Sequence, residues 1–188
     1  MKKLVLGCLL CVMSFSAAAL EMAGAKLEDK VQVGNAPLVL SGAGLRQRFI
    51  IKVYVAGLYL GEKKHGAEAV LSDTGAKRLA LHIRTGSVSP DHFLGGIRKG
   101  IEKNESEQTV AALRERMNAF DKLFEPVKTV SEGDVMRFDW QPGSGTYVSV
   151  NNKEIGIIPG EDFYRALLKV WIGDKPVDED LKKGLLGG

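Results

Sequence analysis

The residues best suited to chemistry lie in one β-rich stretch, LRQRFIIKVYVAGLYL, over residues 45–60. Alternation along a strand places cations and a phenol on one face, which comprises Arg46, Arg48, Ile50, Lys52 and Tyr54. The opposite face, which we expect in the core, comprises Gln47, Phe49, Ile51, Val53 and Val55. The mixed face is therefore either a solvated surface or the wall of a pocket.

The three histidines do not stand at a metal-binding spacing. His65, His82 and His92 form no H-x-x-x-H or H-E-x-x-H pattern, so the sequence predicts no zinc site. A Ser-His-Asp triad formed by residues distant in sequence is still an alternative, but no G-x-S-x-G motif identifies a candidate nucleophilic serine. On the simpler interpretation His82 faces solvent on a strand and His92 lies in the first turn of a helix.

Gly42 and Gly44 share the spacing that opens a dinucleotide-binding fingerprint. The third glycine is absent, and a strand follows where that fingerprint needs a helix N-terminus for the pyrophosphate. We therefore predict a turn over residues 41–44 and no nucleotide cofactor.

The N-terminus has the three parts of a cleavable export signal in the right order. Lys2 and Lys3 precede an apolar run from Leu4 to Phe15, and small alanines follow up to Ala19. The run is shorter than the roughly 20 residues of a membrane span, so a retained anchor is the weaker alternative. We expect a signal peptide over 1–19 and a periplasmic protein over 20–188.

Both cysteines, Cys8 and Cys11, lie in this expected signal, so the mature chain would hold no disulfide or thiolate ligand. Lipidation is disfavoured, because Cys8 has almost no apolar run before it and Cys11 follows the bulky Leu10. Loss of the two signal lysines lowers the formal charge of +3 by two. With so little net charge and no run of like charges, the sequence argues against nucleic-acid binding.

Strand and helix signals indicate one α+β domain. Alternation predicts strands over 37–40, 45–60 (one strand, or two broken near Gly57), 78–84, 135–140, 146–150 and 153–157, with a turn at Asn151-Asn152. Capping and helical spacing predict helices after Ser89, Ser106, Gly160 and Asp178. We expect a large antiparallel sheet with helices packed on one face.

Three patches of the chain resemble the chalcone-isomerase family, specifically its bacterial exported branch. GAGLRQRFIIKVYVAGLYL, residues 42–60, resembles the family's Gly-Ala-Gly, arginine and Gly-aliphatic-Tyr-Leu strand. Arg84 to Phe93 resembles its strand-to-helix junction, and FYRALLKVWIGDKPVDEDLKKGLLG, from Phe163, resembles its last helix, Ile-Gly turn and tail. The resemblance implies an open-faced β-sandwich with a ligand cleft between sheet and helices.

The resemblance also implies a binding site. The plant enzymes close a flavanone ring with an arginine, a threonine, a tyrosine and further polar residues near the last helix. Arg46 matches the arginine and Tyr54 replaces the strand threonine. His92 most nearly matches the tyrosine, and Val170 replaces the threonine before the Ile-Gly turn. Because Val170 offers no donor for a developing oxyanion, we do not expect chalcone cyclisation.

Non-catalytic branches of the family include fatty-acid-binding proteins in which the equivalent arginine holds a carboxylate. A guanidinium offers two parallel donors to a carboxylate and keeps its charge. Arg46 and Tyr54 would then form a polar head-site, with the tail of a small apolar acid in the cleft and no cofactor. The alternatives are an isomerase or intramolecular lyase for a non-flavonoid enone, and an envelope factor that binds only proteins.

Overall fold

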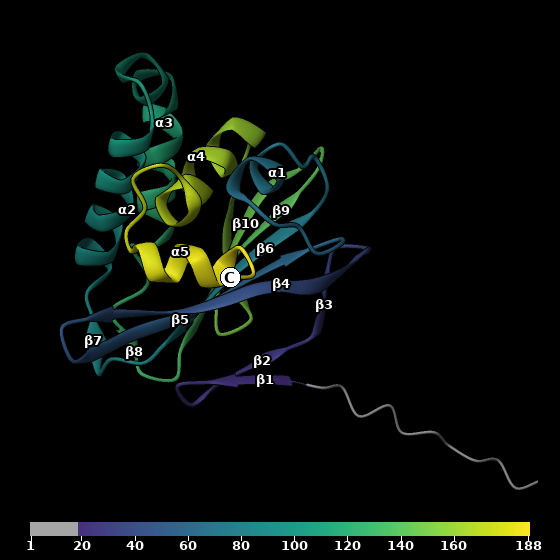
Figure 1. The fold of residues 1–188 in the computed structure, drawn as a ribbon. Coiled ribbons are helices and arrows are strands. Elements are labelled where there is room, and N and C mark those ends of the chain that lie inside the picture. Colours follow the sequence, from purple (N-terminus) through teal and green to yellow (C-terminus); the bar gives the residue numbers. More distant parts are fainter. Residues whose placement is uncertain (1–18) are drawn as a thin grey trace, which may run out of the picture.

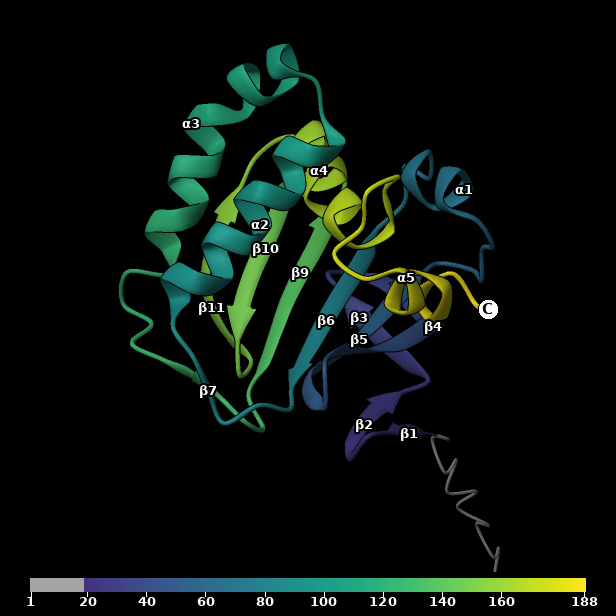
Figure 2. The same ribbon diagram turned by 60° about the vertical axis from the view of Figure 1, so that its left-hand side comes forward.

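The computed structural model describes residues 19–188, which form a large antiparallel sheet with helices on one face (Figures 1 and 2). Seven strands stand in the order β11-β10-β9-β6-β5-β4-β3, and each neighbouring pair is antiparallel. Their bounds are β3 Lys30–Val33, β4 Ala36–Arg48, β5 Ile51–Leu60, β6 Lys77–Ile83, β9 Val135–Gln141, β10 Gly145–Val150 and β11 Lys153–Ile158. The predicted α+β class and open-faced architecture are confirmed.

Two short strand pairs lie outside this sheet. One pairs β1 (Ala19–Met22) with β2 (Ala25–Glu28), and the other pairs β7 (Ser87–Val88) with β8 (Val130–Ser131). The predicted signal peptide lies outside the described residues, apart from Ala19 at the start of β1. Within residues 19–188, no helix has the length and apolarity needed to cross a membrane.

The four predicted helices are confirmed. Ser89 and Ser106 accept hydrogen bonds from the backbone N–H groups three residues on, at 3.3 and 3.2 Å, and so cap α2 and α3. Asp178 caps α5 in the same way, at 2.9 Å. A fifth helix, α1, is a single short turn with no apolar periodicity to reveal it. The bounds are α1 Ala67–Leu71, α2 Pro90–Asn104, α3 Glu107–Leu123, α4 Glu161–Ile172 and α5 Glu179–Leu185.

The core fills the space between the sheet and helices α2, α3 and α4. Phe120 on α3 lies at its centre, with ring centroids 5.3 to 5.9 Å from those of Phe124, Phe138 and Phe163. Leu113 and Met117 on α3 are buried as well. Close packing of this kind makes the inner face of the sheet a rigid wall.

The turn predicted at residues 41–44 does not form, because these residues lie inside β4. Gly42 and Gly44 instead allow α5 to rest directly on this strand. A Cβ at Gly44 would lie 2.8 Å from the Leu181 carbonyl oxygen, and one at Gly42 would collide with the Leu185 carbonyl. Glycines of this kind mark a close backbone approach.

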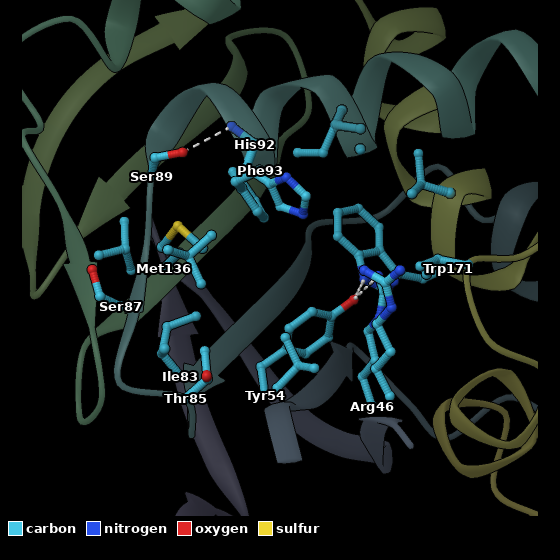
Figure 3. Close-up of a pocket in the computed structure, with 18 residues that line it drawn as sticks. Arg46, Tyr54, Ile83, Thr85, Ser87, Ser89, His92, Phe93, Met136 and Trp171 are labelled. Carbon is cyan, nitrogen blue, oxygen red and sulfur yellow. Dashed lines mark hydrogen bonds between the residues drawn. The ribbon is translucent and has the colours of Figure 1, made fainter. Parts of the chain in front are cut away.

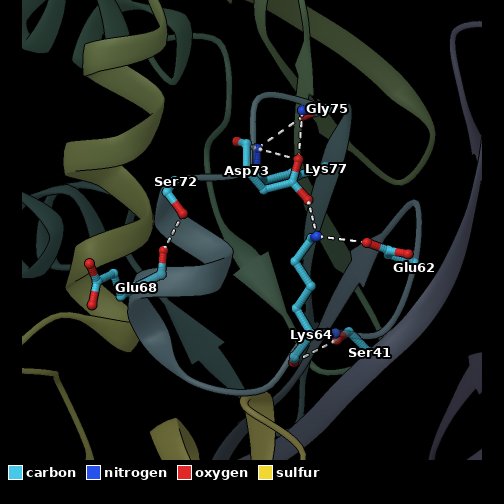
Figure 4. A network of polar contacts seen from close by, with 8 residues as sticks. All are labelled: Ser41, Glu62, Lys64, Glu68, Ser72, Asp73, Gly75 and Lys77. Atoms are coloured by element: carbon cyan, nitrogen blue, oxygen red, sulfur yellow. Dashed lines mark hydrogen bonds and ion pairs between the residues drawn. The ribbon is translucent and has the colours of Figure 1, made fainter.

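Ser41 is the extra residue of a β-bulge in β4, and it ties this strand to the connection between β5 and β6 (Figure 4). Its hydroxyl accepts from the Lys64 N–H at 3.1 Å and donates to the Lys64 carbonyl at 3.3 Å. The Lys64 ammonium lies 3.4 Å from Asp73, and the buried Lys77 ammonium donates to the Gly75 carbonyl at 3.0 Å. Two hydrogen bonds to Lys64 thus stabilise the bulge, and Lys64 in turn belongs to a polar network that includes Asp73.

The stretch over 45–60 reverses at Phe49-Ile50 and not near Gly57. Phe49 has a left-handed φ of 55°. No Gly, Asn or Asp marks this turn, so sequence patterning could not locate it. Gly57 lies inside β5, where a Cβ would come within 2.6 Å of Leu27 from the β1–β2 pair.

This reversal overturns the predicted core face of the stretch. The prediction that Phe49 and Ile51 are core residues is wrong, since they are 88% and 56% exposed. Val53 is half-buried, and only Val55 is fully buried. Alternation relates residues within one strand, and the chain changes strand between them.

The predicted meander of β9, β10 and β11 is confirmed. Asn151 and Asn152 join β10 to β11 with φ values of 51° and 64°. Positive φ at both central residues is the geometry that Asn adopts readily in a two-residue hairpin. The residue types at this turn are therefore usual for its backbone, whereas Phe is an unusual residue at the positive φ of position 49.

Candidate functional site

A cavity of about 470 Å³ lies between the sheet and helices α2 and α4 (Figure 3). Its size falls within the roughly 300 to 1,000 Å³ typical of small-molecule sites. Strands β4, β5, β6 and β9 supply one wall, and the two helices supply the other. The cavity is therefore the cleft that the predicted architecture requires.

Arg46, Tyr54 and Trp171 form the polar end of this cavity (Figure 3). The Trp171 Nε1–H donates to the Tyr54 hydroxyl oxygen at 2.9 Å, and an Arg46 nitrogen approaches that oxygen at 3.5 Å. The second distance is at the limit for a hydrogen bond. The Arg46 Cζ also stands 5.7 Å from the centre of the tyrosine ring, within reach of a cation–π interaction.

The Tyr54 hydroxyl stays protonated over the physiological range. Burial raises the pKa of Tyr54, and the adjacent Arg46 charge only partly opposes that effect. The oxygen already accepts from Trp171 and Arg46, and no acceptor within residues 19–188 takes its proton. The hydroxyl can therefore donate to an oxygen atom of a bound molecule.

Arg46 brings positive charge to the same end of the cavity. Its side chain is half-buried, and within residues 19–188 it forms no ion pair with a carboxylate. Asp178 places negative charge near Tyr54, but one of its carboxylate oxygens is occupied by the Leu181 N–H at 2.9 Å. Most of the five guanidinium N–H donors of Arg46 thus remain available to an anion.

Apolar side chains form the interior of the cavity beyond this polar end. Ile83 and Met136 contribute from the sheet, Phe93 and Ile97 from α2, and Val130 from β8. Four of these five are buried and Phe93 is half-buried. An aliphatic chain here would be stabilised by about 25 cal/mol for each Å² of apolar surface removed from water.

All four predicted ligand-binding residues lie around this one cavity. Arg46 and Tyr54 lie at its polar end. His92 is exposed in the first turn of α2, and its ring points from the helix toward the other residues that line the cavity (Figure 3). Val170 is buried in α4 and adds only methyl groups, which pack so closely on α2 that a Cβ at Gly100 would lie 2.7 Å away.

His82 lies away from this cavity. Its neighbours along β6, Leu81 and Ile83, belong to the core between sheet and helices, so His82 faces the opposite side of the sheet. There it shares a small polar recess with Tyr59 and Arg137. The strand position predicted for His82 is correct. Its side chain, which was expected to face solvent, is half-buried.

Trp171 was not identified as a site residue from the sequence. A buried indole N–H needs an acceptor, and that need was the available signal. Its partner Tyr54 lies 117 residues away, so no local pattern could reveal the pair.

The site offers hydrogen-bond donors and positive charge beside an apolar space. Within residues 19–188, no three His, Cys, Asp or Glu side chains gather closely enough to hold a metal ion. The donors could hold a carboxylate or polarise a carbonyl oxygen.

Together these features define an open-faced β-sandwich that encloses a small-molecule cavity with a guanidinium and a phenol at one end. The family model described as Chalcone isomerase-like matches residues 19–187, and the chain therefore belongs to the chalcone isomerase-like family. The predicted family is thus confirmed. A search of curated proteins found no match.

A solved structure supports the same fold. The crystal structure of a fatty-acid binding protein from Arabidopsis thaliana matches with a TM-score of 0.67. The two sequences are 16% identical, and the match covers 90% of this chain and 96% of that chain. At this identity the likeness establishes the shared architecture, and the ligand must be argued from the site.

Proposed function

We propose that the protein binds a small apolar carboxylic acid, such as a long-chain fatty acid, without converting it. The carboxylate lies on the Arg46 guanidinium and accepts from the Tyr54 hydroxyl, while the aliphatic chain occupies the apolar interior. One observation carries this proposal: Arg46 stands at the end of an apolar cavity and has no carboxylate partner within residues 19–188. Partly burying an unpaired charge is costly, so an anionic ligand is its natural complement.

The structural likeness to a fatty-acid binding protein supports this proposal. The cavity volume supports it as well, because about 470 Å³ accommodates an extended apolar ligand. The charge at one end and the apolar walls beyond it match the two parts of a fatty acid.

The alternative function is that of an isomerase or intramolecular lyase for a non-flavonoid enone, since Arg46 and Tyr54 could also polarise a carbonyl. Binding is favoured because Val170 presents methyl groups where the plant enzymes carry a threonine. We expect no chalcone cyclisation above the spontaneous rate. Saturable and stereospecific flavanone formation would support the enzyme instead.

We also propose that the protein acts in the periplasm as a member of the exported bacterial branch. The basic start, the apolar run and the small residues before Leu20 support this. N-terminal sequencing should return a start near Leu20, with the protein in the periplasmic fraction. A start at Met1 in the cytoplasmic fraction would contradict the proposal.

Native mass spectrometry of protein purified from its own periplasm tests the bound ligand directly. We expect the mass of an acyl chain that is lost on denaturation. An empty protein that turns over an enone would favour the alternative function.

A further inference from the structure

The tip of the β4–β5 hairpin, residues 48–52, carries the most exposed large apolar side chains of the described chain. Phe49 is 88% exposed, Ile50 is 91% exposed and Ile51 is 56% exposed. Elsewhere in residues 19–188 the only exposed large apolar side chains are Leu20 and Ile157, at 40% and 42%. Single exposed apolar residues are ordinary, but three in succession on a protruding turn mark an interaction site.

The backbone of the hairpin tip supports a functional reason for these residues. Phe49 has a φ of 55°, a left-handed conformation that is unfavourable for an aromatic residue. The hairpin at Asn151-Asn152 in the same protein uses residues suited to positive φ. Folding alone would therefore favour Gly, Asn or Asp at position 49, and Phe49 occupies it at a cost in stability.

Two cations flank the apolar residues on the hairpin tip. Arg48 and Lys52 are both exposed, and neither forms an ion pair with an acidic side chain within residues 19–188. Arg48 pairs across the hairpin with Ile51, and Lys52 pairs with Gln47. The tip thus combines exposed apolar side chains with two flanking positive charges, and residues 48–52 include no acidic residue.

We propose that the hairpin tip docks the protein onto a bilayer that contains anionic phospholipids. Phe49 and Ile50 enter the boundary between headgroups and acyl chains, and the two cations contact lipid phosphates. Exposed apolar side chains on a turn can insert into a bilayer without a preformed site, whereas a protein partner would need a complementary pocket. Charge complementarity favours the anionic membrane surface.

Docking at this tip would bring the cavity mouth to the membrane surface. Arg48 lines the cavity as well as flanking the tip, and because Arg48, Ser89 and His92 are all exposed, the cavity opens to solvent beside the tip. An apolar acid dissolved in the bilayer would then reach the cavity over a short path. Vesicle binding by the ligand-free protein does not require the proposed acid binding, so the two proposals can fail separately.

Cosedimentation of ligand-free protein with vesicles tests the docking. The wild type should bind vesicles of equal parts phosphatidylglycerol and phosphatidylcholine on the order of tenfold more strongly than vesicles of phosphatidylcholine alone, and added salt should reduce the difference. Phe49→Asn/Ile50→Gly should lower binding to the anionic vesicles by about tenfold or more. Asn tolerates the positive φ of position 49 far better than Phe, and Gly adopts the backbone of position 50 without strain, so this variant should fold as the wild type does.

The matched control is Ile157→Ser, which removes an exposed apolar side chain from β11 and should leave vesicle binding unchanged. Arg48→Gln/Lys52→Gln should weaken binding to the anionic vesicles on the order of tenfold, and should abolish the preference for them. The docking proposal is overturned if the wild type binds neither vesicle, or if Phe49→Asn/Ile50→Gly and Ile157→Ser behave alike. It is also overturned if the tip variant instead abolishes self-association of the wild type, since the tip would then be a protein contact.

Discussion

Arg46 and Tyr54 lie directly opposite each other on β4 and β5, so one cross-strand pair supplies both polar groups of the cavity. Opposite residues of an antiparallel pair share a face, and the pairing register therefore fixes their proximity. Trp171 on α4 holds the tyrosine from the helical side at 2.9 Å. The site thus depends on the contact between sheet and helix as well as on the strand pair.

Tyr54→Phe should lower the free energy of unfolding by about 1 to 3 kcal/mol. The substitution leaves the buried Trp171 N–H without its acceptor. Urea denaturation measures the change. Tyr147→Phe is the control, because within residues 19–188 its hydroxyl makes no hydrogen bond to another side chain, and it should change stability by less than about 0.5 kcal/mol. Equal effects of the two variants would show that the hydrogen bond contributes nothing.

Gly100→Ala should destabilise the protein by about 1 to 3 kcal/mol, because its Cβ would lie 2.7 Å from a Val170 methyl group. Gly95→Ala is the matched control in the same helix, where an added Cβ meets nothing within 4 Å. That substitution should stabilise by up to about 1 kcal/mol through helix propensity. Thermal unfolding of both variants distinguishes them, and a stabilising Gly100→Ala would refute the close approach of α2 and α4.

The stability of the protein should fall with acidification partly through His82. Burial lowers the pKa of His82 below its ordinary value of 6.5, and the Arg137 charge adds to this effect. The unfolded chain then binds more protons than the folded one as the pH falls through 6.5. This stabilising contribution is therefore complete above that pH and is lost below it.

His82→Gln should remove this contribution to the pH dependence. Urea unfolding of both proteins from about pH 7.5 to about pH 5.5 measures it. The wild type should lose more stability than the variant over this interval. Parallel curves for the two proteins would contradict the assignment to His82.

Local chemistry explains which elements could be predicted from the sequence. Each helix cap, at Ser89, Ser106 and Asp178, binds a backbone N–H group only three residues on. The sequence pattern that predicts such a helix start and the contact that forms it therefore lie in the same short segment. The alternation over residues 78–84 likewise predicted the strand β6. Alternation in the sequence placed Arg46 and Tyr54 on the same face of one strand. In the structure they are close because they lie opposite each other on two paired strands.

The missed features depend on contacts between distant parts of the chain. Gly42 and Gly44 have the composition of a turn, but their role is set by α5 about 140 residues later. The reversal at Phe49-Ile50 lacks the residues that usually mark a hairpin. The sequence therefore predicted that Phe49 and Ile51 are core residues, whereas both lie on the exposed tip that we propose as a docking site.

Carboxylate binding by Arg46 is tested most directly by calorimetry with lauric acid and lauryl alcohol, each titrated into the wild type and into Arg46→Ala. Charge-assisted hydrogen bonds should make the acid bind about 1.5 to 3 kcal/mol more weakly to Arg46→Ala, or roughly ten- to a hundredfold. The alcohol should bind weakly to both proteins and respond little to the substitution. Arg46→Lys should recover only part of the acid affinity, because an ammonium cannot reproduce the two parallel donors. A folded Arg46→Ala variant that binds the acid as tightly as the wild type would contradict the proposed function.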